Sequence, residues 1–202
     1  MRLYTYVVAR DFGFAPNPFF GFCTLATCKP KIRSSARVGD WIVGTGSKAY
    51  RLAGRIVYAM RVCERLSFEE YWIDPRFRLK RPNLKGSVKQ AFGDNIYHRH
   101  SKTRRWVQEN SHHSYSDGRP NQGNVKHDTQ TSSVLISSDF AYWGASGPQI
   151  PVRFRGYRGL DVCAQRGHKC NFPADLSADF AAWIRSLGAK GYVGEPAEFS
   201  RG

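Results

Sequence analysis

The sequence predicts a protein of the α+β class, and three patterns support this prediction. Segments rich in β-branched and aromatic residues alternate between apolar and polar positions near the N-terminus and again near residue 134, as half-buried strands do. A polar stretch at about 80–133 lies between them, and an amphipathic helix follows near the C-terminus. With 202 residues the chain is long enough for one sizeable core, so we expect a single domain over residues 1–202.

The first predicted strand is the segment LYTYVVAR at 3–10, which has the composition and alternation of a strand. The segment at 11–33 carries three prolines and two glycines among aromatic residues. Because proline is excluded from the interior of helices and of most strands, this segment is predicted to be a packed, ordered loop.

A second strand is predicted within VGDWIVGTGS at 38–47, where a Gly-Asp turn leads into the apolar run. A third is predicted within GRIVYAMRVCERL at 54–66, and the short linker between the two predicts an antiparallel hairpin. Gly44 and Gly46 have no side chains, so we expect the end of the second strand to leave room for a ligand to approach the backbone.

A short helix is predicted after Leu66, because Ser67 and Glu70 have the spacing of a capping box and Pro75 ends the segment. The polar insertion at about 80–133 then follows, with one possible strand at 96–108. Polar loops of this length are typically functional or mobile.

The strand signal returns at Val134–Ile136, and a helical extension is predicted at about 174–202. Its helix has one apolar stripe and ends at Gly188. The stripe comprises Phe180, Trp183, Ile184 and Leu187.

The charge of the chain indicates a polyanionic partner. The chain has 31 Lys and Arg residues against 16 Asp and Glu residues, a formal net charge of +15. The window 29–105 holds 19 basic and 6 acidic residues, which is most of this excess. We expect a surface that binds nucleic acid, DNA rather than RNA, with salt-dependent affinity. The predicted phosphate contacts are Lys29, Arg33, Lys48, Arg104 and Arg105.

The expected location is the cytoplasm. The N-terminal segment has only a brief apolar run and no small-residue cleavage site, and no window approaches the length of a membrane-spanning helix, so no membrane partner is expected. The cysteine count, five, is odd, which favours free thiols in a reducing compartment over a disulfide framework.

Several polar side chains are candidates for catalysis or for metal binding. His98 and His100 lie on one face of a possible strand and, together with His112 or His113, have the chemistry of a metal site. No carboxylate or cysteine stands at a recognised ligand spacing, so these histidines are favoured as hydrogen-bonding groups or phosphate contacts. No metal and no cofactor is predicted.

Cys28 has cationic neighbours in Lys29 and Arg33, which would favour a nucleophilic thiolate. A cysteine in an aromatic-rich segment is, however, more often buried and inert. Four aspartates, among them Asp94 and Asp128, have a suitable group for acid–base chemistry. Aspartate next to glycine or proline usually belongs to a turn, so no catalytic pair is assigned.

The order of VGDWIVGTGS, GRIVYAMRV and YWIDPRF resembles the PUA-like superfamily, particularly its EVE and YTH branch, over about the first 80 residues. The resemblance implies a PUA-like, mostly antiparallel β-barrel that is elaborated by the polar insertion and the C-terminal helix. It also implies a pocket for a flipped or unpaired base. The matching positions are Gly39, Asp40, Ser47, Tyr71, Asp74 and Pro75.

Over nearly its whole length the chain also resembles the second of the nucleotide-modification-associated domain families. The segments YVVARDFGFAPNPF, TLATCKPKIR, QAFGDNIYHR and VLISSDFAYWG contribute to this resemblance. It implies a role beside DNA-modification, restriction or phage-defence systems, and partners among their proteins.

Two functions from different classes are therefore predicted. The first is binding of nucleic acid with recognition of a modified or flipped base, and Trp143, which lies among small residues, is the candidate stacking platform. The second is an enzyme that installs or removes a base modification, with Asp94, His98, His112 and His113 as working groups. A partner-binding subunit is a third possibility. The predicted base pocket comprises Thr45, Ser47, Asn95, Tyr97, Trp143 and Ser146.

Overall fold

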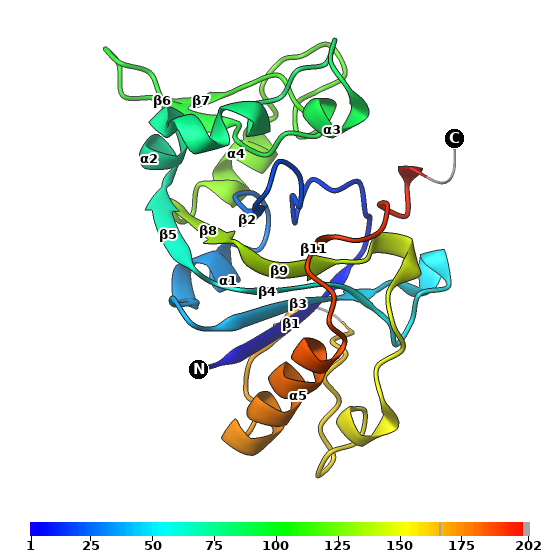
Figure 1. Cartoon of the computed structure of the whole chain (residues 1–202). Coiled ribbons are helices and arrows are strands. Elements are labelled where there is room, and N and C mark those ends of the chain that lie inside the picture. The colour runs from blue at the N-terminus through cyan, green and yellow to red at the C-terminus, as the bar shows by residue number, and fades with distance from the viewer. Residues whose placement is uncertain (166, 200–202) are drawn as a thin grey trace. The chain divides into compact units, whose positions relative to one another are not determined.

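The structure is a computed structural model that describes residues 1–165 and 167–199, and the chain forms two compact units. Both units are built from separated stretches of sequence (Figure 1). Unit 1 comprises Met1–Phe12, Ala36–Cys63 and Ser137–Gly202, and unit 2 comprises Gly13–Ser35 and Glu64–Ile136.

Unit 1 contains a six-stranded sheet in the order β10-β1-β3-β4-β9-β11. β1 pairs in parallel with β3, and β9 pairs in parallel with β11. β3 and β4 pair antiparallel, which confirms the predicted hairpin. The strands are β1 (Leu3–Val8), β3 (Trp41–Gly46), β4 (Ile56–Arg61), β9 (Asp139–Tyr142), β10 (His168–Lys169) and β11 (Gly191–Tyr192).

This sheet is open, since β10 and β11 are its edges. The part of the chain that the structure describes contains no closed barrel, so the PUA-like barrel is not confirmed. The broader prediction of a chain that combines strands and helices is confirmed, but the sheets are mixed as well as antiparallel. A closed barrel would have required the two edges to pair, and both edge strands have only two residues.

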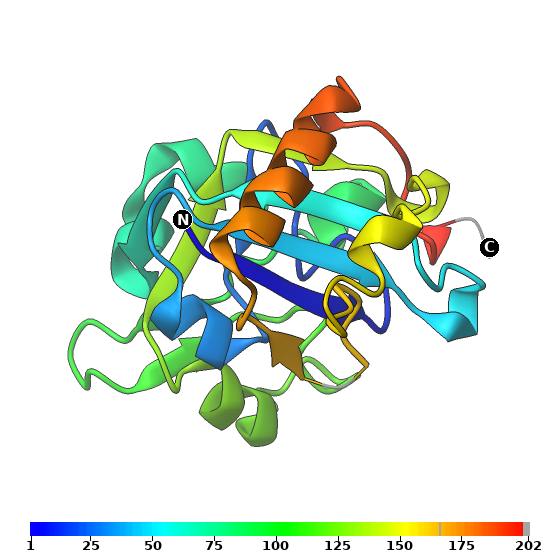
Figure 2. The ribbon, with the colours of Figure 1, turned by 90° about the horizontal axis from the view of Figure 1, so that it is seen from below.

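The helix α5 (Ala174–Ser186) crosses one face of this sheet (Figure 2). Phe180 and Ile184 are buried there, as the apolar stripe predicted. The last three residues of the predicted helical extension lie outside the described residues. The short 3-10 helices of unit 1 are η1 (Lys48–Tyr50), η3 (Gly144–Ser146) and η4 (Val152–Phe154).

The glycines at the end of β3 make room for the protein's own residues. A Cβ on Gly44 would lie 2.4 Å from the Tyr58 ring, and a Cβ on Gly46 would lie 2.3 Å from the Leu52 carbonyl oxygen. Close internal packing therefore accounts for the absence of a side chain at both glycines.

Unit 2 contains a three-stranded sheet in the order β2-β8-β5 and the antiparallel hairpin β6-β7. The predicted capping box of Ser67 and Glu70 is present at α2. The segment 96–108, predicted as one strand, is this hairpin instead. The helices and strands of unit 2 are β2 (Cys23–Leu25), α1 (Pro30–Ser35), β5 (Glu64–Ser67), α2 (Phe68–Ile73), η2 (Pro75–Lys80), α3 (Val88–Ala91), β6 (Tyr97–Arg99), β7 (Trp106–Gln108), α4 (Gln122–Asp128) and β8 (Ser133–Ser137).

Within the described ranges, no helix has both the length and the apolar character needed to cross a membrane.

Candidate active site

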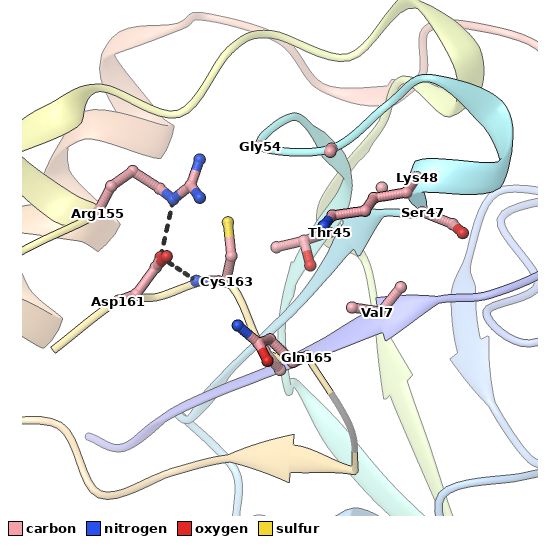
Figure 3. A pocket seen from close by; sticks show the side chains of 12 residues that line it. Val7, Thr45, Ser47, Lys48, Gly54, Arg155, Asp161, Cys163 and Gln165 are labelled. Carbon is pink, nitrogen blue, oxygen red and sulfur yellow. Dashed lines mark hydrogen bonds and ion pairs between the residues drawn. The ribbon is translucent and has the colours of Figure 1, made fainter.

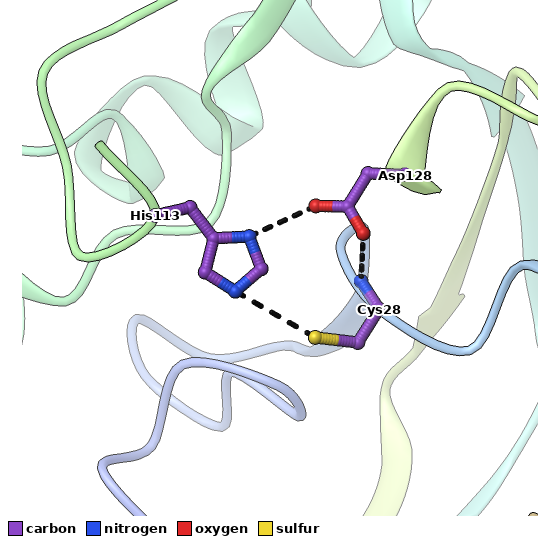
Figure 4. Close-up of side chains that lie close together, drawn as sticks. All are labelled: Cys28, His113 and Asp128. Atoms are coloured by element: carbon purple, nitrogen blue, oxygen red, sulfur yellow. Dashed lines mark hydrogen bonds and ion pairs between the residues drawn. The ribbon is translucent and has the colours of Figure 1, made fainter. Parts of the chain in front are cut away.

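Three side chains of unit 2 form a thiol–imidazole–carboxylate cluster (Figure 4). The Cys28 Sγ lies 3.7 Å from His113 Nε2, and His113 Nδ1 lies 2.9 Å from Asp128 Oδ2. The imidazole therefore stands between the thiol and the carboxylate, with one ring nitrogen facing each. This is the order of groups in enzymes whose nucleophile is activated by an oriented base.

Cys28 stands in the connection between β2 and α1, where the backbone takes an uncommon conformation. Cys28 has a φ of 56° and Lys29 a φ of 40°, both in the left-handed region. Such a conformation costs on the order of 1–3 kcal/mol for a residue with a side chain, and it occurs often at functional sites. Cys28 is also partly exposed.

Asp128, the last residue of α4, is fully buried and accepts from several donors. Its Oδ1 accepts the backbone N–H of Cys28 at 2.8 Å, and its Oδ2 accepts the Tyr97 hydroxyl at 2.9 Å. Gln108, opposite Tyr97 in the hairpin, donates to the same hydroxyl at 2.9 Å. These bonds fix the carboxylate and tie it to the residue that supplies the thiol.

His113 lies in the loop between β7 and α4, and its backbone is also held. The Ser111 hydroxyl accepts the His113 N–H at 3.3 Å, and the Asn124 side chain donates to the His113 carbonyl at 2.8 Å. The Phe14 ring packs against the imidazole, with the ring centroids 4.6 Å apart. The imidazole is thus oriented by its own loop, by an aromatic neighbour and by Asp128.

Arg33 connects the two segments that supply the thiol and the carboxylate. Its Nε donates to the Cys28 carbonyl at 2.8 Å, and its Nη2 donates to the Asp128 carbonyl. Its Nη1 donates to the Ser133 carbonyl at 2.8 Å, and the side chain is fully buried. Arg33 is therefore a positioning residue. This corrects the prediction that it binds phosphate, because a guanidinium with these partners does not reach a surface ligand.

The electrostatics of the cluster favour a charged imidazole. Burial disfavours the imidazolium, but the hydrogen bonds to Asp128 and Cys28 outweigh burial and raise the pKa of His113 to about 9. At neutral pH His113 therefore carries a proton and a positive charge 3.7 Å from the sulfur. A cation at this distance stabilises a thiolate, which is the reactive form of cysteine.

The same three groups are of a kind that can hold a metal ion, and their ligand atoms lie within 4.8 Å of one another. The arrangement fits a metal less well than a catalytic triad. The thiol and the carboxylate face opposite nitrogens of one ring, whereas a metal would need all ligand atoms to point at a single centre. Both Asp128 oxygens are also already occupied by donors.

The other predicted catalytic residues lie outside the triad. Asp94 is fully buried and accepts hydrogen bonds from Thr24 at 2.7 Å and from Tyr71 at 2.8 Å, so its role is structural. His98 pairs with Glu109 at 2.8 Å. The His112 ring packs against Phe14, with the centroids 5.3 Å apart.

His100, which has the chemistry of a metal ligand, accepts the backbone N–H groups of Lys102 and Thr103, both at 3.3 Å. These bonds hold the turn of the hairpin β6-β7. His98 is engaged as well, because its ring stacks on Trp72 with the centroids 4.1 Å apart. The structure therefore gives His98 and His100 local structural roles.

The predicted base pocket is divided between the two units. Trp143 is 6% exposed and lies in the core of unit 1, which corrects its prediction as a stacking platform. The exposed Ser146 donates to the Trp143 carbonyl at 2.8 Å. In unit 2, Asn95 is buried with its amide on the Tyr71 carbonyl, and Tyr97 belongs to the triad network.

Thr45 and Ser47 line a cavity of unit 1 together with Lys48, one of the predicted phosphate contacts. Arg104 and Arg105 are exposed in the turn of the hairpin β6-β7, and Lys29 is half-buried beside Cys28. Of these four predicted phosphate contacts, Lys48 belongs to unit 1 and the other three belong to unit 2. Sequence reasoning missed four residues of the cavity that lie far along the chain, namely Arg155, Asp161, Cys163 and Gln165.

A comparison with protein-family models matches residues 1–202 to the family described as nucleotide modification associated domain 2. The comparison with curated proteins gave no match, and the comparison with solved structures gave none. The match covers the whole chain, including the three residues of the triad.

Proposed function

The chain belongs to the nucleotide modification associated domain 2 family, and from this premise we propose that it is a thiol-dependent enzyme of nucleotide modification. The observation that supports the proposal is the geometry of Cys28, His113 and Asp128. Of the two functions predicted from the sequence, the proposal follows the enzyme. It differs from that prediction because Cys28 is the nucleophile, whereas the prediction named only His and Asp residues.

The proposed reaction is acyl transfer or hydrolysis at a group carried by a nucleotide. The Cys28 thiolate attacks the carbonyl carbon, a C–S bond forms, and the bond to the leaving nitrogen or oxygen breaks. The imidazolium of His113 gives its proton to that leaving atom. An acceptor amine or water then attacks the acyl-enzyme, His113 takes the proton of the acceptor, and the thiolate is released.

Asp128 has the role of the orienting carboxylate. Its bond to His113 Nδ1 fixes which nitrogen faces the sulfur and stabilises the charge on the imidazole. The same carboxylate accepts the Cys28 N–H, which fixes the position of the nucleophile relative to the imidazole. Both effects place the reacting groups before substrate arrives, which is a large part of enzymatic rate enhancement.

Alkylation with iodoacetamide tests the proposal without knowledge of the substrate. In the wild-type protein at pH 7, we expect Cys28 to be alkylated rapidly, because His113 stabilises its thiolate. His113→Ala removes this cation, so the rate at Cys28 should fall roughly 10- to 100-fold. Mass spectrometry of the peptides gives the rate at each cysteine separately.

Two controls separate activation from accessibility. Cys63 is exposed, belongs to unit 1 and makes hydrogen bonds with the Ser137 and Ser138 hydroxyls, so its alkylation rate should not respond to His113→Ala. His127 is an exposed histidine next to Asp128, and His127→Ala should leave the rate at Cys28 unchanged. Equal rates at Cys28 with and without His113 would contradict the proposal.

We further propose that the substrate nucleotide belongs to a nucleic acid that the hairpin β6-β7 contacts. The segment 97–108 contains basic residues and no acidic ones. Among the described residues, Lys102, Arg104 and Arg105 are exposed at its turn, and no hydrogen-bond acceptor or acidic partner contacts their side chains. The turn extends beyond the ends of the two strands (Figure 1).

The hairpin also has a direct connection to the triad, because its Tyr97 donates to Asp128. A basic β-ribbon is a known means of contacting nucleic acid, and phosphate contacts position the strand without reading its sequence. The hairpin accordingly supports binding of a strand. It does not by itself support recognition of a modified base.

Replacing Lys102, Arg104 and Arg105 by alanine should weaken DNA binding and its salt dependence. If each cation contacts one phosphate, the slope of log K against log salt should decrease in magnitude by about 2 to 3. Fluorescence anisotropy of a labelled oligonucleotide, measured across salt concentrations, gives this slope. The matched control replaces Arg78, Lys85 and Lys126, three exposed cations of unit 2, by alanine. Equal losses in both triple variants would assign the affinity to net charge and would overturn the role of the hairpin.

A further inference from the structure

Unit 1 contains a cavity of about 560 Å³, a volume typical of small-molecule sites (Figure 3). Its floor is the end of β3 with Thr45 and Gly46, and one wall continues into Ser47 and Lys48 at the start of η1. The opposite wall comes from the residue after η4, Arg155, and from the segment 161–165. Sequence-distant parts of one unit therefore enclose the space.

Two cations reach into this cavity from opposite sides, Lys48 and Arg155 (Figure 3). Lys48 is exposed and, among the described residues, no acidic side chain pairs with it. Asp161 is the acidic residue of the lining, so the lining carries two positive charges and one negative charge. The cavity therefore favours an anionic ligand.

The guanidinium of Arg155 is held in place for such a ligand. Its Nε donates to Asp161 Oδ1 at 2.8 Å, which leaves both terminal nitrogens available for the cavity. The same carboxylate oxygen accepts the Cys163 N–H at 2.8 Å, so its charge is shared between two donors. A planar guanidinium oriented in this way suits the oxygen atoms of a phosphate group.

Gly54 provides the space that this guanidinium occupies. A Cβ at Gly54 would lie 2.6 Å from Arg155 Nη1, and the φ of Gly54 is 79°. A residue with a side chain would therefore be strained here and would displace Arg155 from the cavity. Gly54, in the turn that follows β3, therefore helps to keep the guanidinium at the cavity.

We propose that this cavity binds the phosphate of a nucleotide, with Lys48 and Arg155 as its phosphate contacts and the remaining volume for sugar and base. The site is separate from the triad, because its lining belongs to unit 1 and the triad to unit 2. A nucleoside monophosphate is the ligand class, since the lining supplies charge for one phosphate group and the family is associated with nucleotide modification.

Isothermal titration calorimetry with the four deoxynucleoside monophosphates tests this proposal. The titrations use the full chain carrying Cys28→Ala, so that binding is measured apart from any thiol chemistry and the two proposals can fail separately. We expect saturable binding of at least one nucleotide, with affinity at least about 10-fold weaker for the matching nucleoside and for inorganic phosphate. Lys48→Ala and Arg155→Lys should each lower the affinity about 10-fold.

Lys190→Ala is the matched control, since it removes one exposed lysine of unit 1 that does not line this cavity. It should leave the affinity unchanged. Arg155→Lys keeps the positive charge, so a loss of affinity in this variant reports the paired N–H groups of the guanidinium. A thermal melt confirms that Lys48→Ala and Arg155→Lys are folded. No saturable binding of any of the four nucleotides overturns the proposal. Binding that is indifferent to both Lys48→Ala and Arg155→Lys also overturns it, because the nucleotide would then lie elsewhere.

Discussion

Replacing Cys28 by alanine is expected to abolish the activity of the protein while leaving its fold intact. The Cys28 side chain supplies the nucleophile, and only a partly exposed thiol is removed, so the packing loss is small. In comparable nucleophile–base pairs, loss of the nucleophile lowers turnover by roughly 10⁴-fold or more. Nucleosides released from the DNA of cells that carry either protein, separated and weighed by mass spectrometry, reveal the difference.

Asp128→Asn should lower the same activity by about 10⁴-fold, because an amide in this place reverses the hydrogen bonds that orient the imidazole. Asn keeps only one acceptor oxygen, so its N–H groups must face either His113 or the Cys28 backbone, and both of these are donors. His127→Ala, which alters the neighbouring exposed residue of α4, should leave the nucleoside profile unchanged. An identical set of nucleosides in the wild type and in Cys28→Ala would exclude the thiol from the reaction.

Replacing Lys80 by methionine is expected to destabilise the protein by about 3–5 kcal/mol, the largest effect that we predict on stability. Lys80 is fully buried, and its ammonium donates to the Asn17 carbonyl at 3.0 Å, the Asn17 side chain at 2.7 Å and the Phe22 carbonyl at 2.9 Å. Burial lowers the pKa of Lys80 to about 8, and the buried Asp94 acts in the opposite direction. Methionine nearly keeps the length of the side chain but removes all three hydrogen bonds. The Asn17 oxygens then keep the Thr24 and Phe19 N–H groups as donors, and the Phe22 carbonyl loses its bond to the ammonium.

Urea denaturation at pH 7 measures this loss. Arg78→Met is the matched control, because Arg78 is an exposed cation on the same 3-10 helix η2. Its free energy of unfolding should change by less than about 0.5 kcal/mol. A loss below about 1 kcal/mol for Lys80→Met would show that water replaces the ammonium, against the buried network described above.

Local sequence patterns were sufficient for several elements of the fold. The alternation of apolar and polar residues predicted the strand at Leu3–Val8, and the spacing of Ser67 and Glu70 predicted the capping box of α2. The apolar stripe with Phe180 gave α5. These features depend on residues within a few positions of one another, so the pattern itself contains the physical cause.

The sequence was misleading where glycine, tryptophan and arginine serve internal packing. Small residues beside Trp143 suggested an open site, but a Cβ at Gly144 would lie 1.9 Å from the Glu195 carbonyl oxygen and one at Gly147 would lie 1.5 Å from the Ile56 carbonyl oxygen. The glycines thus allow distant segments to approach closely. Arg33 has the charge of a phosphate contact, and its burial depends on carbonyl groups that only the fold supplies.

Local sequence patterns could not predict the triad, for the same reason. Cys28 is 85 residues from His113, and His113 is 15 residues from Asp128. Each of the three residues stands out in the sequence as a candidate for chemistry. Nothing in their spacing predicts that one imidazole stands between the other two groups, because that depends on the packing of β2, α4 and the hairpin β6-β7.

The most direct test of the thiol–imidazole pair is the rate of Cys28 alkylation between pH 5.5 and 9.5, in the wild type and in His113→Ala. The pKa of His113 is raised to about 9, so its positive charge is present over most of this range and is lost as the pH rises through about 9. The wild-type rate is therefore expected to exceed the His113→Ala rate below about pH 9, and the difference is expected to narrow above it. Superimposable rate profiles over the whole range would contradict the pair.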